Sequence, residues 1–346
     1  MKFKRYPKVR AAVQAKTRRS ISALLVAACL GLAISALVAR HQPVTTFIRL
    51  VLAVGAPYLI AAALVAVVIA AGHRQRILTV ASVAALVATL AVQLPWYYFG
   101  RTADKAGTQS IRLLSANLRH GNADPRFFVD LARDHADVIT VSELTAEGVG
   151  RFNQAGIAAT FPYSHLLPEP GAGGIGIWSR FPLTVVTAAR HYGVRMPAAW
   201  LEIPGLRYEP LLASVHVTSP VAERTNTVDR WSNGLAGAQA QLTNFARMAG
   251  PGAVIIGGDY NSTPDLRQFR DLLTDGYTDA VEQTGSGFAP TFPSDEWYPP
   301  VITIDHVLTR NAATTPVSTI TIPGSDHRAL LTTVVIPVNP DQPEHQ

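Results

Sequence analysis

The chain of 346 residues is poor in cysteine and, over its first third, in acidic residues. Cys29 is the single cysteine, so an intrachain disulfide is excluded. Residues 1–104 contain 13 Lys or Arg and one acidic residue, whereas residues 105–346 contain 17 Lys or Arg, only one of them Lys, and 23 Asp or Glu. The formal charge of +6 therefore comes from the N-terminal part. The acidic remainder lacks the broad basic surface that duplex DNA binding requires.

Long uncharged runs dominate the N-terminal third. They cover residues 21–39, 50–72 and 77–94. Each run is about long enough to cross roughly 30 Å of hydrocarbon as a helix, so we expect three transmembrane helices. The alternative, a cleaved signal peptide followed by core helices, fits less well because two further runs follow the first.

The charges around these runs predict an orientation. Residues 1–19 carry eight basic and no acidic side chains, so the positive-inside rule places this tail in the cytoplasm. Three spans then place the C-terminal part outside. We expect a multi-pass protein of the cell membrane with an extracytoplasmic C-terminal domain, although Arg40, Arg49 and Arg101 then lie on the outer side as well.

From about residue 108 the sequence changes to short apolar runs separated by polar, Gly-rich and Pro-rich connectors. The expected strands cover 111–118, 137–144, 174–180, 183–189, 198–203, 210–217, 253–261, 303–309, 317–322 and 330–337. The expected helices cover 125–135, 149–155, 232–249 and 266–275. Many strands with few helices between them indicate an α/β fold of two packed sheets flanked by helices.

We therefore expect five regions along the chain. They are a basic cytoplasmic tail (1–19), a three-helix transmembrane anchor (20–99), a linker (100–107), the α/β domain (108–337) and a flexible tail (338–346).

The stretch GGDYN, residues 257–261, directly follows the apolar run AVII. Positions i and i+2 of a strand share a face, so Asp259 and Asn261 would lie side by side at the end of a buried strand. Burying them is costly unless something charged is held there. Similar polar residues stand at other strand ends: Asn117, Glu143, His216, Asp305, Asp326 and His327. If the strands are aligned, all eight side chains converge at one edge of the sheets.

The residue types in this set favour one kind of chemistry. Carboxylate and amide oxygens suit Mg²⁺ or Mn²⁺, and the sequence has no Cys pair or closely spaced His pair for zinc. A hard cation with carboxylates and two histidines suits phosphoester hydrolysis. The metal offsets the phosphate charge, while a general base and a general acid move the protons.

The order N…E…H…GDxN…IDH…SDH, over about residues 108–337, resembles the endonuclease/exonuclease/phosphatase superfamily. The resemblance implies a four-layer α/β sandwich, two packed mixed sheets flanked by helices, and a divalent-metal-dependent phosphohydrolase. It also implies that Glu143 is the principal Mg²⁺ ligand, with Asn117 and Asp326 nearby. His216 separates this chain from the abasic-site endonucleases, which carry a tyrosine at the matching place.

The resemblance implies catalytic roles for five residues. Asp259 would orient or deprotonate the attacking water, and Asn261 would hold the phosphate or the nucleophile. His327 would bind the scissile phosphate, oriented by Asp305. His216 would contact the phosphate or protonate the leaving oxygen.

Three further residues are candidates for substrate binding. Arg180, in IWSRFPL, either contacts phosphate or closes a strand turn. Trp297 and Tyr298 belong to the Pro-rich loop 288–303, just before Asp305, which either touches lipid or sugar or is a packed surface loop.

The layout of the whole chain resembles actinobacterial membrane proteins of the teicoplanin-resistance type, which are thought to act on lipid-linked cell-wall precursors. We therefore expect a lipid-linked phosphate or phospholipid substrate, and no protein partner is predicted. A membrane-tethered nuclease is one alternative, disfavoured by the acidic domain. A non-catalytic membrane module that binds a ligand is another.

Overall fold

The computed structural model describes residues 6–101, 107–187, 194–222 and 227–341. The start of the basic tail (1–5), most of the expected linker (102–106) and the end of the expected tail (342–346) lie outside the described residues. The chain divides into two compact units. Met1–Leu94 with Asp265–Arg267 form the first unit, and Pro95–Pro264 with Gln268–Gln346 form the second.

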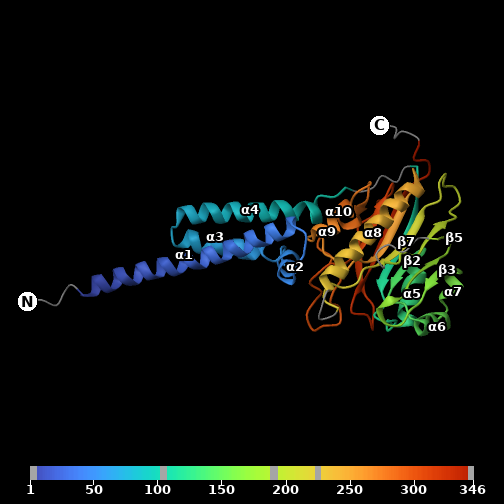
Figure 1. The fold of residues 1–346 in the computed structure, drawn as a ribbon, viewed down its shortest axis with the longest axis horizontal. Helices are drawn as coiled ribbons and strands as arrows, with labels where there is room; N and C mark the ends of the chain where they lie inside the picture. The colour runs from blue at the N-terminus through green and yellow to red at the C-terminus, as the bar shows by residue number, and fades with distance from the viewer. Residues whose placement is uncertain (1–5, 102–106, 188–193, 223–226, 342–346) are drawn as a thin grey trace, which may run out of the picture. The chain divides into compact units, whose positions relative to one another are not determined.

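The first unit is helical (Figure 1). Its helices are α1 (Tyr6–His41), α2 (Phe47–Val54), α3 (Ile60–Gly72) and α4 (Arg76–Tyr98), whose last residues belong to the second unit. Among the described residues, two segments are long and apolar enough to cross a membrane, Val13–His41 of α1 and the whole of α4. By length and composition, these two helices are candidates for a membrane anchor.

The expectation of three spanning helices is wrong for the middle run. A turn at residues 55–59 separates α2 from α3 and leaves α3 with 13 residues, fewer than the about 20 that a bilayer requires. Pro57, within this turn, has no backbone N–H and disfavours a helical conformation at the residue before it. The region therefore has two long apolar helices rather than three.

Small side chains let the helices of the first unit approach closely. Val26 and Leu30 of α1 cluster with Ala66 and Ala70 of α3 and with Ala85 of α4. Large apolar side chains point outward instead, among them Leu24, Ile77 and Val80. This pattern is the reverse of a water-soluble bundle, which shows polar residues to solvent, and it fits helices surrounded by lipid.

The second unit contains two mixed sheets, so the predicted α/β class is confirmed. The first sheet, in the order β11-β13-β1-β2-β4-β3, contains β1 (Thr108–Asn117), β2 (Val138–Ser142), β3 (Tyr163–Leu167), β4 (Ile175–Ser179), β11 (Ala313–Thr314) and β13 (Arg328–Pro337), with β12 (Ser318–Thr321) paired to β13. The second, in the order β5-β6-β7-β8-β10-β9, contains β5 (Leu183–Val186), β6 (Ala198–Leu201), β7 (Leu211–His216), β8 (Val254–Asp259), β9 (Thr278–Asp279) and β10 (Asp305–Arg310).

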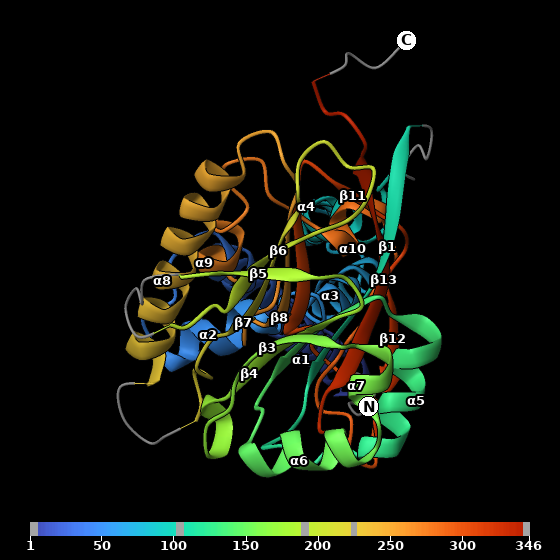
Figure 2. The same cartoon turned by 90° about the vertical axis from the view of Figure 1, so that its right-hand side faces the viewer.

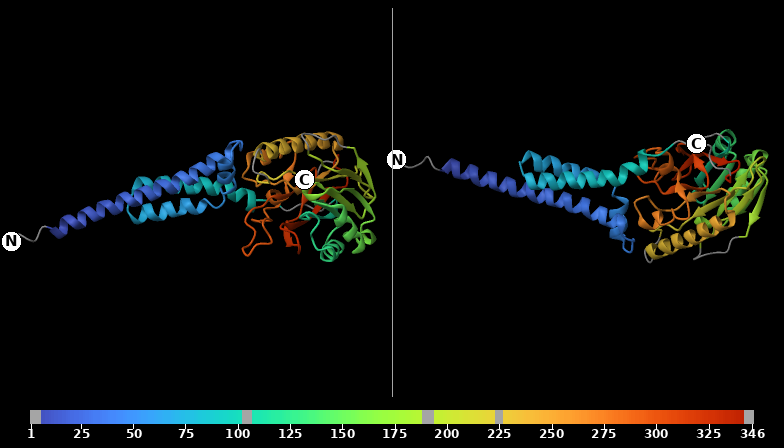
Figure 3. Two further views of the ribbon diagram at one scale, coloured as in Figure 1. Left: turned by 60° about the horizontal axis from the view of Figure 1, so that its bottom comes forward. Right: turned by 90° about the horizontal axis from the view of Figure 1, so that it is seen from above.

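The two sheets pack face to face with helices outside them. Ser214 of β7 donates a hydrogen bond to the carbonyl of Val141 in β2, across the sheet interface. The strands β2 and β8 are buried along their whole length, which explains their nearly continuous apolar sequences. Figures 2 and 3 show α8 (Thr227–Ala249) on the opposite side of the sheets from α5 (Pro125–His135) and α6 (Ala146–Gln154).

Side-chain packing anchors these outer helices. Phe128 of α5, Phe152 of α6 and Ile157 of α7 (Ile157–Thr160) share a core with Leu114 and Trp178 of the first sheet. Asp124 caps α5, because its side chain accepts a hydrogen bond from the backbone N–H of Phe127 at 2.8 Å. The remaining helical pieces are short: η1 (Gly171–Gly173), α9 (Arg267–Arg270) and α10 (Ala280–Thr284).

Candidate active site

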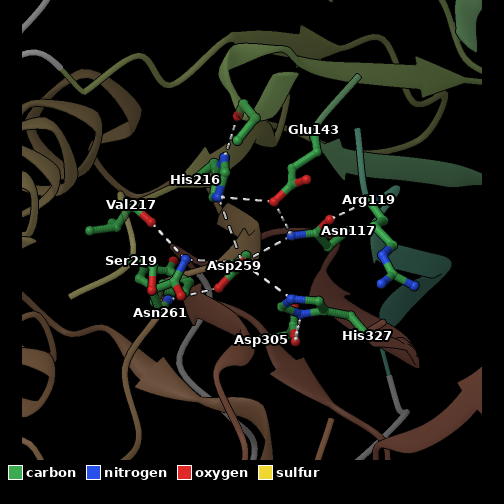
Figure 4. Close-up of polar contacts among 12 residues, drawn as sticks. Asn117, Arg119, Glu143, His216, Val217, Ser219, Asp259, Asn261, Asp305 and His327 are labelled. Atoms are coloured by element: carbon green, nitrogen blue, oxygen red, sulfur yellow. Dashed lines mark hydrogen bonds and ion pairs between the residues drawn. The ribbon is translucent and has the colours of Figure 1, made fainter. Parts of the chain in front are cut away.

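Strand register brings the predicted site residues together. The strand β7 runs parallel to β8, with His216 opposite Asp259, and β8 runs antiparallel to β10, with Asp259 opposite Asp305. In the facing sheet, Asn117 at the end of β1 is aligned with Ser142, the residue before Glu143. Because the sheets pack face to face, these strand ends meet, and the side chains point toward one another in Figure 4.

Asp259 lies at the centre of the network and is almost fully buried. Its Oδ2 accepts hydrogen bonds from the side-chain amides of Asn117 at 3.0 Å and Asn261 at 3.1 Å. Its Oδ1 accepts one from the backbone N–H of Asn261 at 2.7 Å. Burial, together with the charge of Asp305, raises the pKa of Asp259 to about 6, against the opposing effects of His327 and His216. A carboxylate with this pKa is suited to accept a proton near neutral pH.

His327 carries a positive charge in this network. Its Nδ1 lies 2.8 Å from Asp305 Oδ2, and its Nε2 lies 3.9 Å from Asp259 Oδ2. Burial alone would lower the pKa of His327, but the charges of Asp305 and then Asp259 raise it to about 10. The imidazolium donates Nδ1–H to Asp305, so its Nε2–H is directed into the site.

His216 is held in one tautomer by the backbone. Its Nδ1 lies 2.9 Å from the carbonyl oxygen of Ala172, which can only accept, so Nδ1 carries a proton. Its Nε2 therefore faces the site, 3.7 Å from Asp259 Oδ2 and 3.9 Å from Glu143 Oε1. The loop that supplies this carbonyl needs glycine at position 174, because a Cβ there would overlap the carbonyl oxygen of Leu144.

Glu143 directs its two carboxylate oxygens toward donors at the end of β1 and in the turn that follows it. Oε1 accepts a hydrogen bond from the amide of Asn117 at 3.1 Å, and Oε2 accepts one from the backbone N–H of His120 at 2.8 Å. His120 Nε2 also lies 3.3 Å from Oε2. Glu143 has a left-handed backbone with φ of 57°, a strained conformation that persists only where such surrounding bonds impose it.

Asp326 completes the set of eight residues, and its charge also acts to raise the pKa of His327. The neighbouring Ser325 fixes this segment, since its hydroxyl donates to the carbonyl of Asn117 at 2.7 Å and accepts from the backbone N–H of His327 at 3.1 Å. Asp326 Oδ2 lies 3.8 Å from Nε of Arg119. The structure thus brings together all eight strand-end residues that the sequence singled out.

Two residues of the site were missed by sequence reasoning, Arg119 and His120. They follow Asn117 in the stretch NLRHG, which reads as an ordinary polar turn. They reach the site because Arg119, His120 and Gly121 all have left-handed backbones.

The structure does not place Arg180 with the other candidates. Its guanidinium donates to the carbonyls of Ala136 and Arg133 and stacks 5.2 Å over the ring of Phe161. These contacts tie the end of β4 to the end of α5.

Trp297 and Tyr298 lie on an exposed part of the loop before β10. The Trp297 side chain is 92% exposed, and its ring contacts that of Tyr298 edge to face at 5.4 Å. The base of the same loop reaches the site, because Phe292 packs 5.0 Å from the His327 ring and Ser294 N–H donates to the carbonyl of Asp326.

His306, next to Asp305, lies on the opposite face of the strand and bonds outside the site. Its Nδ1 lies 2.8 Å from Asp279 Oδ2 and its Nε2 lies 2.9 Å from the carbonyl oxygen of Ser262.

The donor set of the site fits a metal ion. Within the described chain, Asp259, Asp305 and His327 each offer one ligand atom, and these atoms lie within 4.8 Å of one another. In this set the carboxylate oxygens of Asp259 and Asp305 are the hard donors. Oxygen-rich sets of this kind favour hard divalent cations.

Comparison with known proteins agrees with this geometry. The profile of the Endonuclease/Exonuclease/phosphatase family matches residues 114–327. No curated protein gives a significant match. A family member of known structure from Bacteroides thetaiotaomicron has 14% identity and a TM-score of 0.54, covering 69% of this chain and 99% of that one.

Two further solved structures are similar. The mannosyl-6-phosphatase of Bacteroides thetaiotaomicron has 14% identity and a TM-score of 0.53, covering 65% of this chain and 100% of that one. TDP2 from D. rerio, complexed with a single-strand DNA product, has 17% identity and a TM-score of 0.52, covering 65% of this chain and 99% of that one. At these identities the likeness shows the fold.

Proposed function

The chain belongs to the endonuclease/exonuclease/phosphatase family, and on this premise we propose that it is a membrane-anchored, divalent-metal-dependent phosphohydrolase. Its substrate is a lipid-linked phosphate or a phospholipid, attacked in line by water. The observation that carries the proposal is the buried network in which Asp259, with a pKa raised to about 6, lies between His327 and Glu143.

Asp259 acts as the general base in this proposal. At neutral pH most of the carboxylate is ionised, yet its pKa is high enough to accept a proton from the attacking water. Asn117 and Asn261 orient it, because three of their N–H groups donate to its two oxygens. These fixed donors hold the base in one orientation before the water arrives.

The two histidines act on the phosphate. His327 presents a charged Nε2–H that stabilises the negative charge building up on the non-bridging oxygens, and Asp305 holds its ring in place. His216 presents Nε2 from the other side of Asp259, and when protonated it donates to the leaving oxygen.

A divalent cation, Mg²⁺ or Mn²⁺, would be held by Glu143 with Asp326 and Asn117 nearby. When bound, it neutralises phosphate charge and acts as a Lewis acid on the phosphoryl oxygen. Glu143 is suited to this role because its two oxygens point into the site between fixed donors.

The choice of a lipid substrate is supported by three features. The candidate membrane helices hold the protein at a bilayer, which raises the effective concentration of any substrate in the same membrane. Trp297, with Tyr298 beside it, is an amphipathic aromatic group of the kind found at membrane interfaces. The layout also resembles the teicoplanin-resistance membrane proteins. We propose an extracytoplasmic domain, following the positive-inside rule.

A tethered nuclease is the second candidate, because D. rerio TDP2 has this fold and was solved with a DNA product. The excess of acidic residues after residue 104 opposes it. A non-catalytic ligand-binding module is disfavoured, since all eight site residues are present and in contact or adjacent.

The test offers four substrates to the full-length protein in nanodiscs with Mg²⁺: undecaprenyl pyrophosphate, sphingomyelin, a phosphoinositide and supercoiled plasmid. We expect turnover of a lipid phosphate that Asp259→Asn abolishes. Asp229→Asn, the same change at an exposed position of α8, serves as the matched control. Plasmid nicking without lipid turnover would establish the nuclease, and no turnover of any substrate would support the binding module.

A further inference from the structure

Arg119 is a cationic side chain at the outer part of the site that the proposed mechanism leaves without a role. Four carboxylates face the site, those of Glu143, Asp259, Asp305 and Asp326, and the His327 imidazolium lies buried among them. The Arg119 side chain is 40% exposed, whereas that of His327 is 6% exposed. An anionic substrate that enters from solvent therefore meets the guanidinium before it meets the imidazolium.

The backbone directs this side chain toward the site. Arg119, His120 and Gly121 have φ values of 45°, 53° and 74°, which turn the chain sharply after β1. The N–H of Arg119 donates to Asn117 Oδ1 at 2.8 Å, so the turn is fastened to a residue of the site. Gly121 has no room for a side chain, because a Cβ would lie 2.5 Å from Thr145 Oγ1. Figure 4 shows the guanidinium on the same side as His327.

The contacts of the guanidinium leave part of it available. Its Nη1 lies 2.7 Å from Asp295 Oδ2, and its Nε lies 3.8 Å from Asp326 Oδ2. Among the described residues, neither of these contacts uses Nη2. The pair with Asp295 is open to water, since the Asp295 side chain is also about one third exposed. Exposed pairs of this kind are weak and readily exchanged for another anion.

We propose that Arg119 binds a second phosphate of the substrate, so that the site selects diphosphate esters over monophosphate esters. This inference rests on the proposed phosphohydrolase function. A phosphate joined to the scissile one through a bridging oxygen extends from His327 toward the mouth of the site, where Arg119 stands. The planar guanidinium matches two phosphate oxygens at once. Asp295 holds the guanidinium in the same position when the site is empty.

Hydrolysis of such a substrate needs water as the only other reactant. Water attacks the terminal phosphorus, the bond from this phosphorus to the bridging oxygen breaks, and the products are inorganic phosphate and a lipid monophosphate. Arg119 then stabilises the charge that develops on the leaving phosphate.

A purely structural role for Arg119 makes a different prediction. If the Arg119–Asp295 pair only holds the loop 288–303 against the site, then replacing either residue has the same effect on diphosphate binding. If Arg119 binds phosphate, Asp295→Asn frees the guanidinium, and diphosphate binding is kept or strengthened.

The test measures binding by calorimetry, with the full-length protein in nanodiscs and Mg²⁺ in excess over the ligand. The probes are methylenediphosphonate and methylphosphonate, which are not hydrolysed. We expect the wild type to bind the diphosphonate about tenfold more tightly or better, as charge-assisted hydrogen bonds to phosphate allow. Arg119→Gln should remove this preference and leave methylphosphonate binding unchanged. Arg133→Gln, at an exposed position of α5, should have no effect.

Three outcomes overturn the inference: a wild type without the preference, a preference that survives Arg119→Gln, or an equal loss in Asp295→Asn and Arg119→Gln. Arg119→Lys should keep only part of the preference, because an ammonium group lacks the planar fork. Failure of the proposed function gives a different result from failure of this inference. It would appear as a diphosphonate preference in a protein that releases no phosphate from farnesyl diphosphate or farnesyl monophosphate.

Discussion

Replacing Asp305 by asparagine removes the carboxylate that accepts Nδ1–H from His327 and keeps the shape of the side chain. Burial opposes the charge on His327, and Asp305 is the largest of the groups that raise its pKa to about 10. At the observed 2.8 Å, Coulomb's law with an effective dielectric constant of about 20 gives an attraction on the order of 6 kcal/mol, or about four pKa units. Asp259 remains nearby, so we expect a net fall of at least about two units.

The direction of the pH effect follows from this shift. Without a bound cation, His327 of the wild type is protonated below pH about 10, and a bound cation lowers this value; turnover declines as the pH rises through the His327 pKa. In Asp305→Asn the decline begins at lower pH. The free energy of unfolding depends on pH in the same direction as turnover. The raised pKa of His327 stabilises the folded state fully below its pKa in the unfolded state, about 6.5, and this contribution disappears as the pH rises toward 10. The variant therefore loses stability mainly at acidic and neutral pH.

The assay is NMR of the full-length protein with ¹³C-labelled histidine, in which His327→Gln assigns one of the ten histidine signals. A pH profile of kcat is measured in parallel. Asp279→Asn is the matched control, because it removes the carboxylate partner of His306, the residue that follows Asp305 in β10. A wild-type His327 pKa and an unchanged profile in Asp305→Asn would refute the reasoning.

Three other measurements test separate parts of the site. Glu143→Gln should lower the apparent affinity for Mg²⁺ about 10–100-fold, measured by metal titration of the activity. The acidic limb of the pH profile should have its midpoint at about 6 or, with the cation bound, lower, because Asp259 must be deprotonated; a midpoint well above 7 would contradict the general-base role. Gly174→Ala should destabilise the domain by about 1–3 kcal/mol in chemical unfolding, since the added methyl group meets the carbonyl of Leu144, and Gly150→Ala, where no atom lies within 4 Å, is the control.

Much of the second unit could be predicted from the sequence, because both faces of its central strands are covered. The apolar runs that became β2 and β8 were identified as strands, and the polar residues at their ends marked the site. The two-residue strands β9 and β11 were missed because so short a segment has no periodicity to detect. The strand β3, YSHLL, lies at a sheet edge and lacks the apolar signal of a buried strand.

Features that depend on backbone turns could not be predicted in the same way. The expected helix at 266–275 is reduced to α9, residues Arg267–Arg270. The expected second membrane span was read from hydropathy alone, and hydropathy does not register the turn around Pro57. Arg119 and His120 reach the site only because the chain turns left-handed after β1, a choice that the sequence NLRHG does not impose.

Left-handed backbone conformations gather at the site. Four of the seven non-glycine residues with positive φ among the described residues belong to it: Arg119, His120, Glu143 and Asn261. Each such conformation costs about 1 kcal/mol or more, and the surrounding hydrogen bonds must hold it. The amide of Asn261 shows how this is done, because its backbone N–H and its side chain both donate to Asp259.

Asn261→Gly separates the strain from the function. Glycine relieves the left-handed backbone, which is stabilising, but it loses the side-chain bonds to Asp259 and to the carbonyl of Val217. We expect near-wild-type thermal unfolding and a fall in kcat of about 10²-fold or more, since the base loses one of its orienting donors. Asn311→Gly, at another left-handed position away from the site, should change neither kcat nor the fold. A fully active Asn261→Gly would mean that the backbone alone positions Asp259.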